Sequence, residues 1–366
     1  MFLVMDKIIS FPHMGNYHIA LEFLFKSLFK DLKIKASPPI TKRTIELGSK
    51  YSPDFVCIPF KYNLGNYIEA LENGANILMQ SGGGCRYGYY GEVQEQILRD
   101  LGYDFEFISI LSDDVKPIKL YNICRRLGCN LSIYRFLYYI KLAFNMVIFI
   151  DKIEGFIREN IGFELEKNSF ENLHKEFLNE LRYVKNFKML SSIYINYEHK
   201  FRCLKIYKPC NCLKVGLVGE LYTLMEPFSN FFIEKELAKY KIVMKRFTTA
   251  TFLMFEKSKV FKKILKEAEG YLKYHIGADG TDSVANSKRL AIEGFDGIIH
   301  VKPFGCTPEV NAMPILQNIA KDYKIPILYI SFDSQTAETG IKTRLEAFND
   351  MIVMRKGKLE KQRMGS

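Results

Sequence analysis

The sequence predicts an α/β protein with two Rossmann-like or flavodoxin-like parallel-sheet domains and an intervening helical region. Short apolar strand patterns alternate with helical patterns in the first third of the chain, and the alternation returns from about Leu213. Between these stretches, long helical patterns carry few strand signals. We therefore expect an N-terminal α/β domain over 1–116, a mainly helical region over 117–211, a C-terminal α/β domain over 212–352 and a basic tail over 353–366.

In the expected N-terminal domain, apolar strands and helices follow one another in order. The expected strands cover 7–11, 54–59, 75–79 and 105–110, and the expected helices cover 17–32, 64–72 and 91–100. Asn73-Gly74 is a typical helix stop, and the third strand runs into a stretch of three glycines. This order is that of parallel βαβ units, in which helices connect the strands.

The expected C-terminal domain repeats the same alternation. Its expected strands cover 214–218, 241–245, 296–301 and 325–330, and its expected helices cover 228–240, 260–269, 281–292, 309–323 and 338–351. Thr281 or Asp282 could cap the helix that follows them, and Pro308 suits a first helical turn.

Composition excludes several classes of protein. The chain has 366 residues, of which 48% are hydrophobic and 25% charged, so it can bury a substantial core and wholesale disorder is excluded. Its 12 prolines and 24 glycines exclude a collagen-like or linker-dominated chain. The formal net charge of +11 favours nucleic acid, an anionic membrane or a phosphorylated ligand, or reflects only a soluble, Lys-rich surface.

The N-terminal segment and one long apolar stretch bear on localisation. Residues 1–11 have no basic start and no small-residue cleavage site, so we expect no signal peptide. The stretch 131–150 contains Arg135 and Lys141, and its apolar residues recur at helical spacing, which favours a partly buried helix over a membrane span. We expect a cytoplasmic protein without a membrane partner.

Three of the eight cysteines share a position in this scheme. Cys57 lies at the end of an expected strand, Cys85 follows a strand and three glycines, and Cys306 follows a third strand. Ligands of open α/β sheets bind outside the carboxyl ends of the strands, so these thiols could converge on one inorganic centre. Soft thiolates favour iron–sulfur, zinc or copper(I), although the same residues could be small buried hydrophobes at strand ends. We expect the backbone to approach such a centre closely at four residues that have no side chain, Gly82, Gly83, Gly84 and Gly305.

Charged residues beside these cysteines have two interpretations each. Arg86 could contact an anion or tune a negatively charged cluster. Glu309 begins a helix, where a carboxylate is favourable by itself, and it could also act on a substrate or orient a ligand loop. His300 is more typical of a structural residue than of a catalytic one.

Four sequence motifs together resemble a known family. They are Cys57-Ile58-Pro59-Phe60-Lys61 with Leu64-Gly65-Asn66, the run from Gly82 to Glu92, Gly216-Leu217-Val218-Gly219-Glu220 with Glu226-Pro227-Phe228, and Pro303-Phe304-Gly305-Cys306-Thr307-Pro308-Glu309. The sequence resembles the 2-hydroxyacyl-CoA dehydratase D-component superfamily from about residue 7 to 350. Within that superfamily, the motifs are most similar to those of the activase-associated branch, the CoA-protein activases.

The resemblance implies an iron–sulfur cluster, [4Fe-4S] or double-cubane, on three cysteines from separate segments. Motif matching places these ligands at Cys57, Cys85 and Cys306, with Cys124 as a reserve. Lys61 is expected, like Arg86 and Glu309, to contact either the residues around the cluster or the substrate.

The resemblance also implies partners and a class of reaction. Low-potential electron transfer or reductive dehydration of a CoA thioester is expected, in an anaerobic setting. We recognise no actin-like nucleotide domain, so an ATP-dependent activator protein would hydrolyse ATP. If the chain is an enzyme, it is a lyase-type dehydratase or a component of an ATP-dependent double-cubane reductase, paired with itself or with a related dehydratase subunit.

Two other classes of function stay open. The chain could be a binding or regulatory module that kept the fold and lost the cluster. The basic, aromatic-rich middle could contact nucleic acid, but no recognised binding motif accompanies it, so nucleic acid is not an expected partner.

Overall fold

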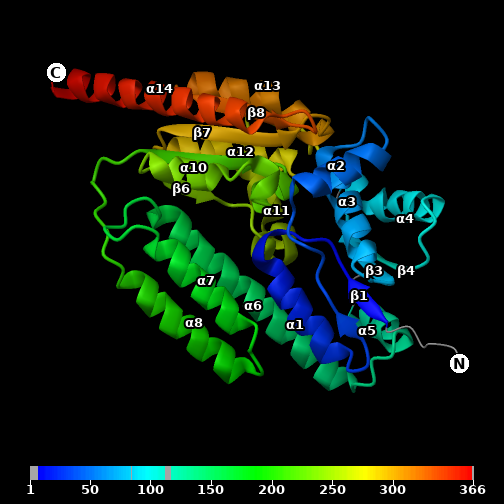
Figure 1. Ribbon diagram of the computed structural model, residues 1–366. Helices are drawn as coiled ribbons and strands as arrows, with labels where there is room; N and C mark the ends of the chain where they lie inside the picture. The colour runs from blue at the N-terminus through cyan, green and yellow to red at the C-terminus, as the bar shows by residue number, and fades with distance from the viewer. Residues whose placement is uncertain (1–6, 84, 112–116, 365–366) are drawn as a thin grey trace, which may run out of the picture. The chain divides into compact units, whose positions relative to one another are not determined.

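The chain folds into two compact units, each built on one parallel sheet. The computed structural model describes residues 7–83, 85–111 and 117–364. The N-terminal unit comprises Met1–Ile150 and Glu176–Ile195, and the C-terminal unit comprises Asp151–Lys175 and Asn196–Ser366. Both units carry a four-stranded, all-parallel sheet (Figure 1), which confirms the predicted α/β class with two parallel-sheet domains.

The N-terminal sheet has the strand order β2-β1-β3-β4. Its strands are β1 (Ile8–Ser10), β2 (Lys33–Ile34), β3 (Ile77–Gly82) and β4 (Glu106–Leu111), and its helices are α1 (His18–Leu28), α2 (Lys42–Tyr51), α3 (Ile58–Glu72) and α4 (Tyr90–Asp100). Alternate residues of β3 face opposite clusters: Ile77 and Met79 pack with α1, and Leu78 packs with α3 and α4. Helices therefore cover both faces of the sheet, as in doubly wound folds.

The C-terminal sheet repeats this order as β6-β5-β7-β8. Its strands are β5 (Lys214–Gly219), β6 (Val243–Arg246), β7 (Gly297–Pro303) and β8 (Ile327–Phe332), and its helices are α9 (Leu221–Met225), α10 (Ile233–Lys239), α11 (Lys257–Glu267), α12 (Gly280–Ile292), α13 (Thr307–Asp322) and α14 (Glu338–Met364). Every residue of β7 is buried, as expected of a central parallel strand. Helix α14 continues well beyond the expected end at 351, so residues 353–364 of the basic tail are helical.

The expected strand over 54–59 is wrong. Helix α3 begins there, at Ile58, with Pro59 in its first turn and Cys57 at its N-cap. Thirteen of the fifteen residues of α3 are buried, so its N-terminal turn is as apolar as a buried strand. A short apolar run cannot be assigned to strand or helix by periodicity alone.

The middle of the chain consists of α5 (Pro117–Arg126), α6 (Ile133–Asn160), α7 (Ser169–Leu181) and α8 (Phe187–Arg202). Within the described ranges, α6 is the one helix long and apolar enough to cross a membrane, with 33% of its most apolar window buried. A core helix of a soluble protein has the same length and composition. Phe136, Leu142 and Met146 of α6 are fully buried, which confirms the expected partly buried helix.

Two glycines bring helices α2 and α3 into backbone contact. A Cβ atom at Gly48 would lie 1.8 Å from the carbonyl oxygen of Lys61, and a Cβ atom at Gly65 would lie 1.9 Å from that of Thr44. Both obstacles are backbone, so neither can move aside as a flexible side chain would. The first turns of α3, which follow Cys57, are held by this close packing.

We expect Gly65→Ala to destabilise the N-terminal unit by about 1–3 kcal/mol, since the two helices must separate to admit a methyl group. Differential scanning calorimetry would show the lower melting temperature. Gly340→Ala in α14 is the matched control, because no described atom lies within 4 Å of its Cβ position. There the change is expected to be neutral or stabilising, as alanine is the better helix former. An equal melting temperature for Gly65→Ala and the wild type would contradict the close packing.

Candidate metal centre

The strand order of each sheet defines where a ligand is expected. In each sheet, the first strand of the unit has the second strand on one side and the third strand on the other. The switch point therefore lies at the carboxyl ends of β1 and β3 in the N-terminal sheet and of β5 and β7 in the C-terminal sheet. Cys85 follows β3 and Cys306 follows β7. Cys57 does not end a strand as expected, but it begins a helix. All three cysteines occupy N-cap positions: Cys57 on α3, Cys85 on the short helical turn η2 (Arg86–Tyr89), and Cys306 on α13.

In the N-terminal unit, Cys57 and Cys85 each contact one member of a tyrosine pair. The Sγ atom of Cys57 is hydrogen-bonded to the hydroxyl of Tyr90. The Sγ atom of Cys85 accepts a hydrogen bond of 3.4 Å from the backbone N–H of Tyr87. The ring centroids of Tyr87 and Tyr90 are 4.9 Å apart. The structure thus brings the segments of two predicted ligands to one region of the unit.

The glycines near Cys85 and Cys306 differ in whether a side chain would fit at their position. A Cβ atom at Gly82 would lie 2.7 Å from Cδ1 of Tyr87 and 2.9 Å from its carbonyl oxygen, so a glycine is required there for the turn that carries Cys85. Gly83 lies beside Gly88, and Gly84 falls outside the described residues. At Gly305 a Cβ atom would meet no atom of the described residues within 4 Å. A role of Gly305 in approaching a cofactor stays a prediction.

In the C-terminal unit, a buried cation lies beneath the loop that carries Cys306. Lys302 is 3% exposed, and its ammonium donates hydrogen bonds to the carbonyl oxygens of Phe304 at 3.2 Å and Pro303 at 3.5 Å. Burial lowers the pKa of Lys302, while Cys306 and Glu309 oppose that shift. The backbone N–H of Cys306 donates to the carbonyl of Pro303 at 3.1 Å. The ammonium therefore binds the same short loop whose end holds the thiol.

Glu309 faces the interior of the C-terminal unit. It is fully buried, its carboxylate lies 2.6 Å from Nε2 of His300, and it accepts a hydrogen bond of 3.1 Å from the hydroxyl of Ser283. These contacts join the first turn of α13 to β7 and α12. Of the two expected roles of Glu309, orienting the loop of Cys306 matches this placement, since its carboxylate is not presented to solvent.

Arg86 and Lys61 follow the two cysteines of the N-terminal unit. Arg86 is exposed and comes directly after Cys85. Lys61 is half-buried in the first turns of α3, four residues after Cys57. Each cysteine segment of this unit thus carries a cationic side chain.

Cys124, the reserve ligand, lies in surroundings that do not suit a metal ligand. It is 1% exposed and packs in the core cluster of the N-terminal unit with Cys129 and Phe136. Burial, with a further contribution from Cys129, raises the pKa of Cys124 to about 12. A thiol in that setting stays protonated, whereas metals are bound by the thiolate.

A network of buried charges at the carboxyl end of β5 was not expected from the sequence. Lys257, which follows the π-helical turn η5 (Phe252–Glu256), lies 3.1 Å from Asp279 and 2.5 Å from Asp282. Burial raises the pKa of Asp282 to about 6, against the opposing effect of Lys257. Glu220 caps α9, accepting from the backbone N–H groups of Tyr222 and Thr223, and burial together with Asp279 raises its pKa to about 7.

The sequence contained one signal that points to this network. Gly219-Glu220 lies directly after an apolar strand, much as Cys306 lies just after β7. Gly219 has φ of +140°, and a Cβ atom there would lie 1.8 Å from the carbonyl oxygen of Val301. Glycine is therefore required where β5 passes β7. The next residue, Glu220, lies at the switch point between these two strands.

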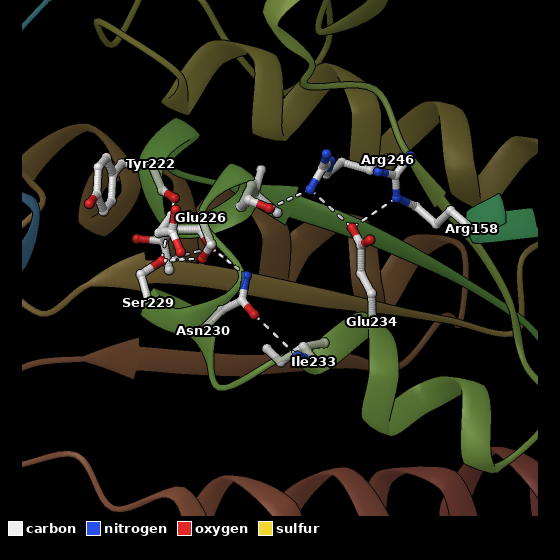
Figure 2. Close-up of polar contacts among 10 residues, drawn as sticks. Arg158, Tyr222, Glu226, Ser229, Asn230, Ile233, Glu234 and Arg246 are labelled. Carbon is white, nitrogen blue, oxygen red and sulfur yellow. Dashed lines mark hydrogen bonds and ion pairs between the residues drawn. The ribbon is translucent and has the colours of Figure 1, made fainter. Parts of the chain in front are cut away.

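The segment after Glu220 is anchored by an ion triad of two buried arginine side chains and the partly exposed Glu234 (Figure 2). Arg158 and Arg246, both 5% exposed, lie 2.8 Å and 3.0 Å from the carboxylate of Glu234. Burial would raise the pKa of Glu234, but the two arginines outweigh it and lower the pKa below its ordinary value. Asn230 holds the turn before α10, donating to the carbonyl of Thr223 at 2.7 Å and accepting from the backbone N–H of Ile233.

The donor set suits a thiolate-held cluster in its chemistry. Cys57, Cys85 and Cys306 are thiols outside any disulfide; Cys85 is exposed, and the other two are intermediate in burial. The first two belong to the N-terminal unit and the third to the C-terminal unit. Among the described residues, no three His, Cys, Asp or Glu side chains already lie close enough together to hold a metal ion.

Comparison with known protein families finds a match over part of the chain. The model for the 2-hydroxyglutaryl-CoA dehydratase D-component matches residues 233–352. This range runs from the start of α10 into α14 and includes Lys302, Cys306 and Glu309. No curated protein matches the chain.

Proposed function

Because this chain belongs to the superfamily of the 2-hydroxyglutaryl-CoA dehydratase D-component, we propose that it holds an iron–sulfur cluster on Cys57, Cys85 and Cys306. The family indicates a component of a 2-hydroxyacyl-CoA dehydratase. Within that class, we propose low-potential electron transfer or reductive dehydration of a CoA thioester. The activase-associated branch remains part of this proposal.

The observation that carries the proposal is the shared placement of three thiols at helical N-termini. An N-terminus presents unpaired backbone N–H groups and the positive end of the helix dipole to its cap residue. Negative charge on a sulfur or on a bound anionic cluster is therefore stabilised at Cys57 and Cys306, which begin α-helices, and a backbone N–H serves the same purpose at Cys85. The Tyr87 N–H on the sulfur of Cys85 is one such contact.

The surrounding residues divide into those that hold the thiols and those that could meet a substrate. When bound, an iron–sulfur cluster supplies a low-potential electron carrier and a Lewis-acidic iron. Lys302 places a cation beneath Cys306, and Glu309 holds the helix that Cys306 begins. Arg86 and Lys61 supply cationic groups that suit a phosphorylated ligand such as a CoA thioester.

The proposed partners follow from the same family. An ATP-dependent activator protein would deliver electrons, and a second copy of the chain or a related dehydratase subunit would complete the assembly. The proposed setting is a cytoplasm without oxygen.

Anaerobic purification tests the proposal directly. We expect iron and acid-labile sulfide in the wild type, at about four irons per chain for a single [4Fe-4S] cluster, and an EPR signal on reduction. Single Cys→Ser variants at 57, 85 and 306 should each lose most of the iron, because each removes one of three protein ligands.

Cys210→Ser is the matched control, since Cys210 is also an exposed thiol but lies outside the proposed site. It should retain the wild-type iron content. Iron-free protein after anaerobic expression and reconstitution would contradict the cluster and favour the binding or regulatory module. Iron that survives all three single substitutions would place the cluster on other ligands.

A further inference from the structure

We propose that Tyr90 is a positioning residue for the metal centre, because its hydroxyl is hydrogen-bonded to the sulfur of Cys57. The inference rests on the proposed function, in which Cys57 is a cluster ligand. A phenol keeps its proton at neutral pH and acts as the donor, and a thiolate sulfur can only accept. Hydrogen bonds to ligand sulfurs are among the means by which a protein sets the reduction potential of a cluster.

Packing fixes the position of the Tyr90 hydroxyl. Tyr90 is the first residue of α4 and is 7% exposed. Its ring meets that of Phe60 edge to face, with centroids 4.9 Å apart and planes at 82°. Phe60 lies in the first turn of α3, and its backbone N–H donates to the carbonyl of Cys57 at 3.0 Å. One helical turn therefore carries both the sulfur and the ring against which Tyr90 is seated.

The second cysteine of this unit is tied to the same pair of helices. Tyr87, whose backbone N–H contacts the sulfur of Cys85, accepts a hydrogen bond of 2.6 Å from Nδ2 of Asn63 in α3. Its ring packs against Tyr90 at 4.9 Å. The tyrosine pair thus connects the turn that begins at Cys85 with the helix that begins at Cys57. Tyr87 contacts its sulfur through the backbone, and Tyr90 contacts its sulfur through the side chain.

Tyr90→Phe isolates the hydrogen bond, because it removes one oxygen and keeps the packed ring. In the iron-loaded protein, a reductive titration followed by EPR should give a more negative midpoint potential than the wild type. The reason is that the lost donor stabilises the additional negative charge of the reduced cluster. Tyr89→Phe is the control: Tyr89 lies in the same turn but is 71% exposed, and its midpoint should equal that of the wild type.

A second measurement does not require iron. In metal-free, reduced protein at a single pH, the rate of alkylation of Cys57 by iodoacetamide can be followed by peptide mass spectrometry. We expect Tyr90→Phe to slow it several-fold at pH 6.5, because losing a hydrogen bond to the charged acceptor lowers the thiolate fraction there by more than it raises the nucleophilicity of the thiolate. Tyr89→Phe should not change it. Calorimetry checks that both variants are folded.

The two measurements separate the failure of this inference from that of the proposed function. A folded Tyr90→Phe variant with the wild-type midpoint and the wild-type alkylation rate would overturn the role of Tyr90. Wild-type protein that never binds iron would contradict the cluster. In that case the alkylation rate alone decides whether Tyr90 acts on the sulfur of Cys57.

Discussion

Glu309→Ala is expected to destabilise the C-terminal unit by about 3 kcal/mol, because it leaves two buried hydrogen-bonding groups without their partner. The fully buried carboxylate holds His300 at 2.6 Å and the hydroxyl of Ser283 at 3.1 Å, and alanine would leave both groups buried without it. The substitution also opens a cavity beneath the first turn of α13. Differential scanning calorimetry should show a clearly lower melting temperature.

Two further variants decide whether the effect comes from this contact. Glu309→Gln keeps the shape and an oxygen for Ser283, so it should recover a large part of the lost stability. Glu338→Ala removes a carboxylate from the first turn of α14, where the side chain is 54% exposed, and should cost under about 0.5 kcal/mol. If Glu309→Ala melts like Glu338→Ala, the buried contact does not anchor the loop of Cys306.

Glu220→Gln is expected to stabilise the protein at pH 8 and to have little effect at pH 5. Burial and the neighbouring Asp279 raise the pKa of Glu220 from 4.5 to about 7. A carboxyl group with a raised pKa contributes its full stability below its unfolded pKa and loses it as the pH rises through the folded pKa. The loss therefore falls between about pH 4.5 and 7, and its size is about 3 kcal/mol.

Melting curves of the wild type and of Glu220→Gln at pH 5 and pH 8 measure this difference. Glutamine is neutral at both values and keeps an oxygen for one of the two backbone N–H groups, which donate to different oxygens of Glu220. The control Glu338→Gln changes an exposed carboxylate and should show no such dependence on pH. A difference between Glu220→Gln and the wild type that is the same at both pH values would contradict the raised pKa.

Much of the fold could be predicted from the sequence because the parallel strands are buried and bounded by turn residues. The patterns at 75–79, 214–218 and 296–301 correspond to β3, β5 and β7, each an apolar run of β-branched and aliphatic residues. The run at 54–59 failed because α3 is buried on nearly every side. Strand β2 is only two residues long and leaves no pattern to recognise.

The site could be predicted only in part. Strand ends and motifs brought attention to Cys85 and Cys306, and the structure places both just after strands, each beginning a helical element. The contact between Cys57 and Tyr90 joins residues 33 positions apart, which local patterns cannot reveal. The partial burial of Lys257 beside the buried Asp279 and Asp282 is likewise a property of tertiary packing, since the same residue types are usually found on the surface.

The placement of the thiols at helix N-termini has a consequence for handling the protein. Accessible sulfurs in electropositive surroundings are also those that peroxide attacks first. Oxidation beyond the sulfenic acid is irreversible for most proteins, so a chain in which one of these thiols is oxidised that far before metal is bound can no longer be reconstituted. Cys85, which is exposed, would be damaged before Cys57 and Cys306, which are shielded in part.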